Sequence, residues 1–76
     1  MTGSEVATHT ISVSVNGERR AVPAGTTLGG LVSTLTDAHS GVAAAVNEAV
    51  VPRGRWQETV LDDGDRVEVL TAVQGG

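Results

Sequence analysis

The chain has 76 residues, enough for one small domain, and 39% of them are hydrophobic while 18% are charged, which is typical of a folded globular domain. Nine acidic residues against five arginines give a net charge of −4, which argues against nucleic-acid binding because phosphate contacts need a basic surface. The sequence contains no cysteine, which excludes disulfides, thiolate metal sites and a cysteine nucleophile.

Residues 1–8 are small and polar without periodicity, so we expect a disordered lead-in there. They lack the basic start and apolar core of a signal peptide, and no apolar stretch approaches the roughly 20 residues of a membrane helix. A cytoplasmic location without membrane contact is therefore predicted. His9 and His39 are far apart and no cysteine helps them, so a metal site is not expected.

Apolar and polar side chains alternate from Ile11 to Val15, which predicts a half-buried strand. Asn16-Gly17 follows, and this dipeptide favours a tight hairpin because both residues tolerate positive φ. A second strand is predicted over residues 18–22. Proline cannot donate a ladder hydrogen bond, so Pro23 ends this strand.

A helix is predicted after the turn at Ala24-Gly25, with Thr26 or Thr27 capping it through its hydroxyl. The apolar residues then follow the i, i+3, i+4, i+7 spacing of one helix face. They are Leu28, Leu31, Val32 and Leu35.

The predicted helix is locally weak, since Gly29 and Gly30 each cost roughly 1 kcal/mol relative to alanine. We expect the helix to end near His39, with Gly41 taking the left-handed position after its C-terminus.

Residues 42–46 are apolar throughout, which favours a strand buried on both faces. Asn47-Glu48 predicts a turn, and residues 49–51 a brief edge strand that Pro52 ends.

Residues 53–59, which include Trp56, are predicted to be irregular or to form a single helical turn. Residues 62–65 predict a tight turn, because aspartate and glycine favour turns. The segment is too short for a calcium-binding loop. The last strand is predicted over residues 66–73. Its inward side chains are expected to be Val67, Val69, Thr71 and Val73.

The fold class is therefore α+β, with one main helix packed on a sheet of four or five strands. The domain is predicted to span residues 9–73, followed by a flexible tail at 74–76.

The tail ends in Gly75-Gly76, a pair that chance alone produces in about one chain in two hundred. Glycine lacks Cβ, so such a tail can thread a channel too narrow for side chains. A carboxylate is a poor electrophile and must gain a better leaving group, such as AMP from ATP, before a persulfide sulfur can attack it. We therefore expect the Gly76 carboxylate to be the reacting group, with Gln74 and Gly75 providing reach.

The chain resembles the sulfur carriers of thiamine biosynthesis, the ThiS family, which share the ubiquitin-like β-grasp fold. The resemblance implies that the sheet of four or five strands is mixed. The resemblance covers roughly residues 10–76. The segments that carry it are Val15-Asn16-Gly17-Glu18, the leucine-rich helix, the run from Val42 to Trp56 with Asn47 and Val51-Pro52-Arg53, the turn and strand from Asp63 to Val69, and Gly75-Gly76. Gly29-Gly30 departs from the family pattern, where a helix-forming pair is more usual.

The resemblance implies a cycle in which the chain is a carrier and no enzyme. An E1-like adenylyltransferase (ThiF-type) uses ATP with Mg²⁺ to adenylate Gly76. Sulfur, ultimately from cysteine through a desulfurase, converts it to a thiocarboxylate. Thiazole synthase (ThiG-type) then takes the sulfur for the thiazole of thiamine. No cofactor is expected to bind the carrier itself.

Three side chains are candidates for partner docking. Leu70 breaks the inward phase of the last strand and should lie exposed on the opposite face, beside the tail. Trp56 is predicted mainly as a packing residue with its indole N–H directed to water or a carbonyl. Arg53 is predicted to be solvated or paired with an acid, with docking as the minor alternative.

The sequence leaves three other functions open. The small subunit of molybdopterin synthase or another pathway-specific carrier shares the fold and the Gly-Gly end. A ubiquitin-like modifier would instead end as an amide on target lysines. An interaction module of the same fold would make no use of the tail.

Overall fold

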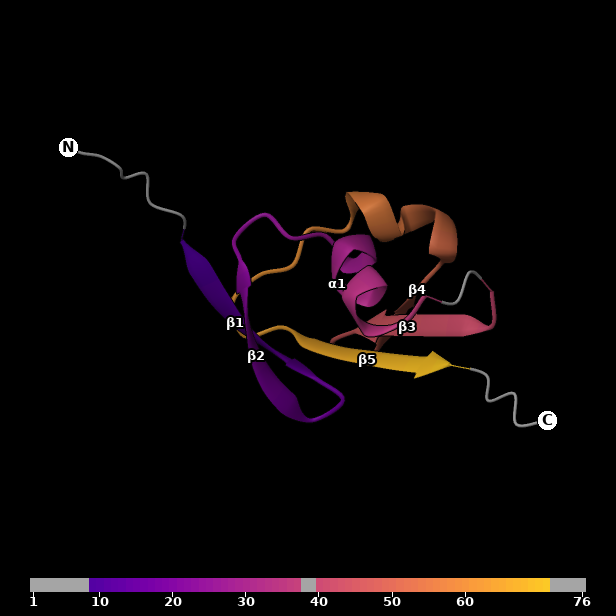
Figure 1. The fold of residues 1–76 in the computed structure, drawn as a ribbon, viewed down its shortest axis with the longest axis horizontal. Coiled ribbons are helices and arrows are strands. Elements are labelled where there is room, and N and C mark those ends of the chain that lie inside the picture. The colour runs from indigo at the N-terminus through magenta and orange to yellow at the C-terminus, as the bar shows by residue number, and fades with distance from the viewer. Residues whose placement is uncertain (1–8, 38–39, 72–76) are drawn as a thin grey trace.

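The structure is a computed structural model that describes residues 9–37 and 40–71 (Figure 1). The predictions for the lead-in at 1–8 and the tail at 74–76 fall outside the described residues, as do Ala72 and Val73 of the predicted last strand.

The described strands form one mixed sheet in the order β2-β1-β5-β3-β4. The strands β1 and β5 run parallel at the centre, whereas β1 with β2, β3 with β5 and β3 with β4 are antiparallel. The first and last strands of the domain are therefore neighbours. The bounds are β1 Thr10–Val15, β2 Glu18–Pro23, β3 Val42–Val46, β4 Ala49–Val51 and β5 Arg66–Thr71.

Two hairpins close with turns whose central residues have positive φ. Asn16 (φ 52°) and Gly17 (φ 87°) join β1 to β2, as predicted. Asn47 (φ 52°) and Glu48 (φ 73°) join β3 to β4, again at the predicted place. Positive φ at both positions matches the right-handed twist of the strands, which is why these turns set the register of each hairpin.

The helix α1 (Leu28–Leu35) begins where the sequence predicts, and Thr27 is its N-cap. The hydroxyl of Thr27 accepts a hydrogen bond from the Gly30 N–H at 3.0 Å. The Leu28 N–H, also free of an intrahelical partner, donates to the Thr59 carbonyl at 2.8 Å. Two of the orphan donors at the helix start are thus satisfied, which offsets part of the cost of the glycine pair.

The helix ends one turn earlier than predicted, at Leu35 instead of near His39. Thr36 is the C-cap, with extended backbone (φ −154°, ψ 149°). The apolar stripe stops at Leu35, so a further turn would bury nothing, and Thr36 and Asp37 have low helix propensity. Gly41 does have positive φ (73°), but it lies six residues beyond Leu35 and leads into β3 instead of capping the helix.

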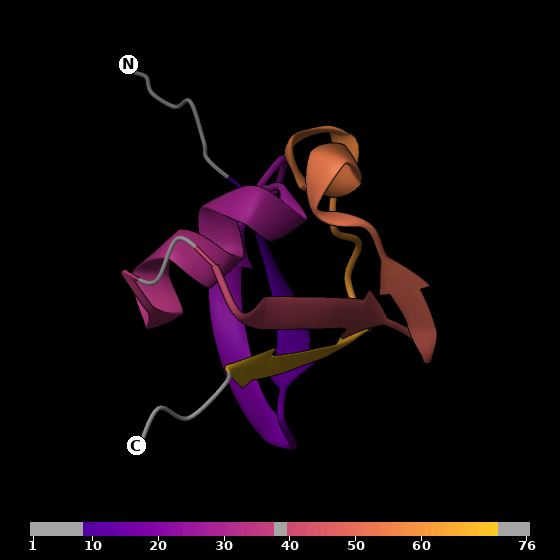
Figure 2. The ribbon, with the colours of Figure 1, turned by 90° about the vertical axis from the view of Figure 1, so that its right-hand side faces the viewer.

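Residues Arg53–Glu58 form a 3-10 helix, η1, which packs beside α1 on the same face of the sheet (Figures 1 and 2). Gly29 allows this approach, because a Cβ on it would lie 2.8 Å from the Gln57 amide nitrogen. Trp56 is 5% exposed and its indole N–H donates to the Val51 carbonyl at 2.9 Å. The predicted packing role of Trp56 is confirmed.

The core lies between the sheet and the two helices, and its members are almost all aliphatic. They are Val13, Val15, Val22, Leu28, Leu31, Val32, Ala44, Trp56, Leu61, Val67 and Val69. Burying an aliphatic side chain fully contributes roughly 1.5–3 kcal/mol, so this cluster supplies most of the driving force for folding.

The other face of the sheet carries no helix of the described residues (Figure 2). The prediction that residues 42–46 are buried on both faces is therefore wrong. Only Ala44 is buried, while Ala43 is exposed. The inward phase of β5 is confirmed for Val67 and Val69 but wrong for Thr71, which is exposed because it lies beyond the core.

The glycines of α1 give a stability prediction. Replacing Gly30 by alanine should raise the free energy of unfolding by about 0.5–1 kcal/mol, because helix propensity improves and a Cβ there makes only ordinary contacts, with the Thr27 hydroxyl at 3.4 Å and the Thr26 methyl at 3.9 Å. Urea unfolding followed by circular dichroism measures it. Gly29→Ala is the matched control and should gain less, since Gln57 must move. A loss of stability in Gly30→Ala would contradict the account of the helix.

Candidate functional site

The described part of β5 ends at Leu70 and Thr71, directly before the segment in which the sequence places the reacting group. The predicted site residues Gln74, Gly75 and Gly76 lie outside the described residues. The structure therefore bears on how the domain holds β5 and on what surface lies beside its end.

Both edges of β5 are paired, one by β1 from the start of the domain and the other by β3 from the middle of the chain. On one edge β3 pairs antiparallel with β5 over five residue pairs, from Val46 with Val67 to Val42 with Thr71. On the other edge the parallel ladder with β1 has only two pairs, which end at Val15 with Val67. The ladder with β1 is short because the chain turns away from β5 at Asn16.

The side chain of Asn16 continues this second edge where the backbone of β1 stops. Its Oδ1 accepts from the Val69 N–H at 2.9 Å, and its Nδ2 donates to the Val69 carbonyl at 3.1 Å. The backbone N–H of Asn16 also donates to the Val67 carbonyl at 2.9 Å. The carboxamide thus satisfies both the N–H and the carbonyl of Val69, as an opposite residue does in an antiparallel hydrogen-bonded pair.

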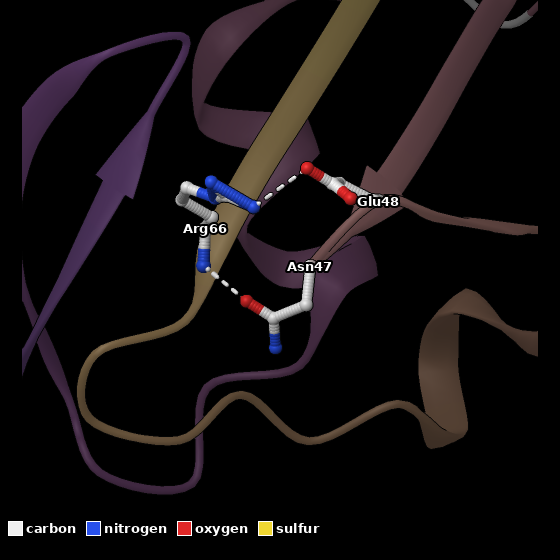
Figure 3. Close-up of polar contacts among 3 residues, drawn as sticks. All are labelled: Asn47, Glu48 and Arg66. Atoms are coloured by element: carbon white, nitrogen blue, oxygen red, sulfur yellow. Dashed lines mark hydrogen bonds and ion pairs between the residues drawn. The ribbon is translucent and has the colours of Figure 1, made fainter.

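Asn47 holds the start of β5 in a related way (Figure 3). Its Oδ1 accepts from the Arg66 N–H at 2.9 Å and its Nδ2 donates to Asp65 at 2.9 Å. Glu48, the next residue of the same turn, forms an ion pair with Arg66 at 3.0 Å. Both side chains of that pair are more than half exposed, so the ion pair contributes little to stability.

The turn before β5 uses its aspartates as hydrogen-bond acceptors. Asp63 accepts from the Ser12 N–H at 2.8 Å, and Asp65 accepts from the Asp62 N–H at 2.8 Å. Gly64 has φ 88° and its N–H donates to the Ser12 carbonyl at 2.7 Å. The prediction of a tight turn is confirmed, and these contacts tie it to β1.

Leu70 is 71% exposed and lies on the open face of the sheet, as predicted. Ala43 is its cross-strand partner on β3, and Ala45 in turn pairs with Val50, which is 76% exposed. The small alanines leave a shallow hollow of about 290 Å³, which Glu48 and Glu68 also line. We call Ala43, Ala45, Glu48, Val50, Glu68 and Leu70 the open-face patch.

The other two docking candidates lie on η1, on the covered face. Arg53 lies over the Trp56 ring, with 4.9 Å between its guanidinium carbon and the ring centroid. Docking by Arg53 and Trp56 stays a prediction, and Trp56 offers little exposed surface for it. The structure therefore does not bring these two together with Leu70.

The described residues contain no group of three or more His, Asp or Glu side chains placed to hold a metal ion. In the same part of the chain, no helix is both long enough and apolar enough to cross a bilayer.

The model of the ThiS family matches residues 13–76 of this sequence. This chain belongs to the ThiS family. The match begins within β1 and covers the rest of the first hairpin, the helix, the second hairpin, β5 and the Gly75-Gly76 end.

Similar proteins agree with the ThiS assignment. The sulfur carrier protein ThiS of Escherichia coli is 29% identical over 66 residues, which cover 87% of this chain and all of that protein. The crystal structure of the thiamine biosynthesis protein ThiS from Geobacter metallireducens has a TM-score of 0.71 at 30% identity and is covered completely. This likeness confirms the predicted β-grasp fold.

A protein named thiazole synthase, from Magnetococcus marinus, is 41% identical over 66 residues. The match covers 87% of this chain but only 20% of that protein. A stretch similar to this ThiS-family domain is therefore one part of a much longer polypeptide.

The hydrogen bonds of Asn47 give a prediction for this ThiS-family domain. Asn47→Gly should lower the free energy of unfolding by about 1–2 kcal/mol, because the Arg66 N–H and Asp65 lose their partner while glycine keeps the positive φ. Asn47→Ala should cost about 1 kcal/mol more, since φ 52° is strained for alanine. Urea titrations of both variants measure the two steps, and equal stabilities of glycine and wild type would contradict the anchoring role.

Proposed function

We propose that this chain is a sulfur carrier protein of thiamine biosynthesis, which works as a co-substrate of other enzymes. The observation that carries the proposal is the ThiS family match, because it extends through the Gly75-Gly76 pair. The two relatives that the chain covers completely support it, since both bear the ThiS name.

The reacting group of the proposed cycle is the Gly76 carboxylate. An E1-like adenylyltransferase of the ThiF type transfers AMP from ATP, with Mg²⁺, to this carboxylate and releases pyrophosphate. The carbonyl carbon then has AMP as a good leaving group. No cofactor needs to bind the carrier, since the adenylyltransferase holds ATP and the metal ion.

Sulfur enters as the terminal atom of a persulfide, supplied from cysteine by a desulfurase. Its attack on the adenylate expels AMP and forms an acyl disulfide, and a thiol that cleaves the S–S bond leaves the thiocarboxylate on Gly76. The carrier has no cysteine, so both the persulfide and this thiol must belong to partner proteins.

Thiazole synthase is the proposed acceptor of the sulfur. The support is the Magnetococcus marinus protein, in which a stretch similar to this chain shares a polypeptide with an enzyme of that name. We also propose that the carrier is cytoplasmic, because the cycle uses ATP and cysteine, which are cytoplasmic metabolites.

The open-face patch is the proposed docking surface for the adenylyltransferase. Gly76 is the fifth residue after Thr71, and an extended chain of five residues spans at most about 18 Å. The patch that contains Leu70 therefore lies within reach of the active site that receives Gly76. Glu48 and Glu68 beside the hollow favour a partner that presents an apolar side chain flanked by basic groups.

Mass spectrometry of the intact chain tests the carrier function. After incubation with adenylyltransferase, ATP, Mg²⁺, a persulfide donor and a thiol that cleaves the acyl disulfide, we expect the mass change of one oxygen exchanged for one sulfur. Deletion of Gly76 should abolish the change without altering the fold. Amide-linked adducts on lysines of other proteins, with no thiocarboxylate, would instead identify a ubiquitin-like modifier and contradict the proposal.

Leu70→Arg tests the docking surface. The added charge replaces an apolar contact and meets the proposed basic rim of the partner, so the dissociation constant for the adenylyltransferase should rise at least about tenfold. Calorimetric titration measures it. Val60→Arg is the matched control, because Val60 is also exposed (57%) but is bridged to Thr27 at the start of α1, on the covered face. Equal effects of the two variants would contradict a specific role of the patch.

A further inference from the structure

We propose that Asn16 is a positioning residue, whose carboxamide holds the end of β5 in line so that the reacting terminus is presented to the adenylyltransferase. The proposal rests on the sulfur-carrier function proposed above. It concerns a side chain that lies 53 positions before its partner Val69 and takes no part in the chemistry.

The need for such a residue follows from the sheet. The parallel ladder from β1 stops at Val67, four residues before the described end of β5. A hollow of about 450 Å³ lies beside this end, lined among others by Asn16, Val69 and Thr71. Among the described residues, the Asn16 side chain supplies the hydrogen bonds to β5 beyond Val67 on this edge.

The geometry of Asn16 suits the task. Its backbone must take φ 52° to start the hairpin turn, which asparagine tolerates. That same conformation places Oδ1 and Nδ2 at 2.9 and 3.1 Å from the N and O atoms of Val69. The turn at Asn16 thus ends the ladder between β1 and β5, and the side chain of the same residue makes the next hydrogen bonds to β5.

The consequence for function is an entropic one. An end of β5 that is held on both edges loses less freedom when the partner binds the terminus that follows it. Loss of the carboxamide should let β5 fray from Val69 onward. The entropy lost on ordering this segment again then reduces the free energy of binding to the adenylyltransferase. The effect should appear in KM for the carrier, with kcat nearly unchanged, because the bound terminus reaches the same active site.

Asn16→Gly is the decisive variant, since glycine keeps the positive φ and the backbone bond to Val67 while only the side chain is lost. Gly17→Ala is its matched control. Gly17 has φ 87° and open space around it, so alanine strains the same turn but leaves the carboxamide in place.

Amide hydrogen exchange of the full chain tests the contact itself. In Asn16→Gly the Val69 amide should exchange at least about tenfold faster relative to amides of β3, as expected for a lost hydrogen bond in a locally opening strand. Gly17→Ala should change all strand amides in proportion to its overall stability. Unchanged relative exchange at Val69 would overturn the proposal.

Initial rates of pyrophosphate release at varied carrier concentration test the functional consequence. At a temperature where all variants are folded, Asn16→Gly should raise KM about three- to tenfold with kcat within about twofold, whereas Gly17→Ala should match the wild type. Asn16→Asp, which keeps the acceptor for the Val69 N–H, should fall between.

The outcomes separate two failures. If the wild type releases no pyrophosphate with the adenylyltransferase, the proposed sulfur-carrier function is wrong. If the wild type is a substrate but Asn16→Gly behaves like Gly17→Ala, the function stands and the positioning role of Asn16 is overturned.

Discussion

The pairing of β5 on both edges is the constraint on which the rest of this domain depends. A strand at the edge of a sheet would be free to fray, but β5 lies between β1 and β3 at the centre. Its partners are β1, near the start of the domain, and β3, in the middle of the chain, so both ladders of β5 join segments that are distant in the sequence. Val67 and Val69 secure the same strand from the core side by burial at 0% and 7% exposure.

The two faces of the sheet differ in what covers them. The face under α1 and η1 is closed by the aliphatic core, and Gly29 permits the close approach of η1 that brings Trp56 over one end of it. The open face carries the small alanines of β3 between Val50 and Leu70, so its surface is shallow. A domain of this kind offers a partner a recognisable surface, while the proposed chemistry takes place on the terminus that follows β5.

The features that depend on neighbouring residues could be predicted from the sequence. Asn16-Gly17 and Asn47-Glu48 specify turns through φ alone, and Thr27 caps a helix through its own hydroxyl, so each element begins in the predicted place. The exposed position of Leu70 followed from the period of a strand. These local rules also sufficed to predict one main helix on a sheet of four or five strands, whereas the mixed sheet was expected from the resemblance to the ThiS family.

The features that depend on residues distant in the sequence could not be predicted from it. Residues 42–46 were predicted to be buried on both faces because a run of apolar residues does not show that one face of the sheet lacks a covering helix. The end of α1 is a different case, since the local signals after Leu35 were outweighed by the expectation that Gly41 follows the C-terminus of the helix. The contact of Asn16 with Val69 spans 53 positions, and its turn signal fully accounts for the asparagine. Leu61, 2% exposed, was missed because it lies outside any regular element.

The path of the sulfur atom tests the central claim most directly. Cysteine carrying labelled sulfur would be supplied to the desulfurase, adenylyltransferase, ATP, a thiol, this chain and thiazole synthase with the co-substrates that provide the carbon and nitrogen of the ring, and the label followed over time. The account predicts that label appears on the intact chain first and then leaves it as an equal amount enters the thiazole. Labelled thiazole formed while the chain stays unlabelled, or label that thiazole synthase cannot remove from the chain, would contradict it.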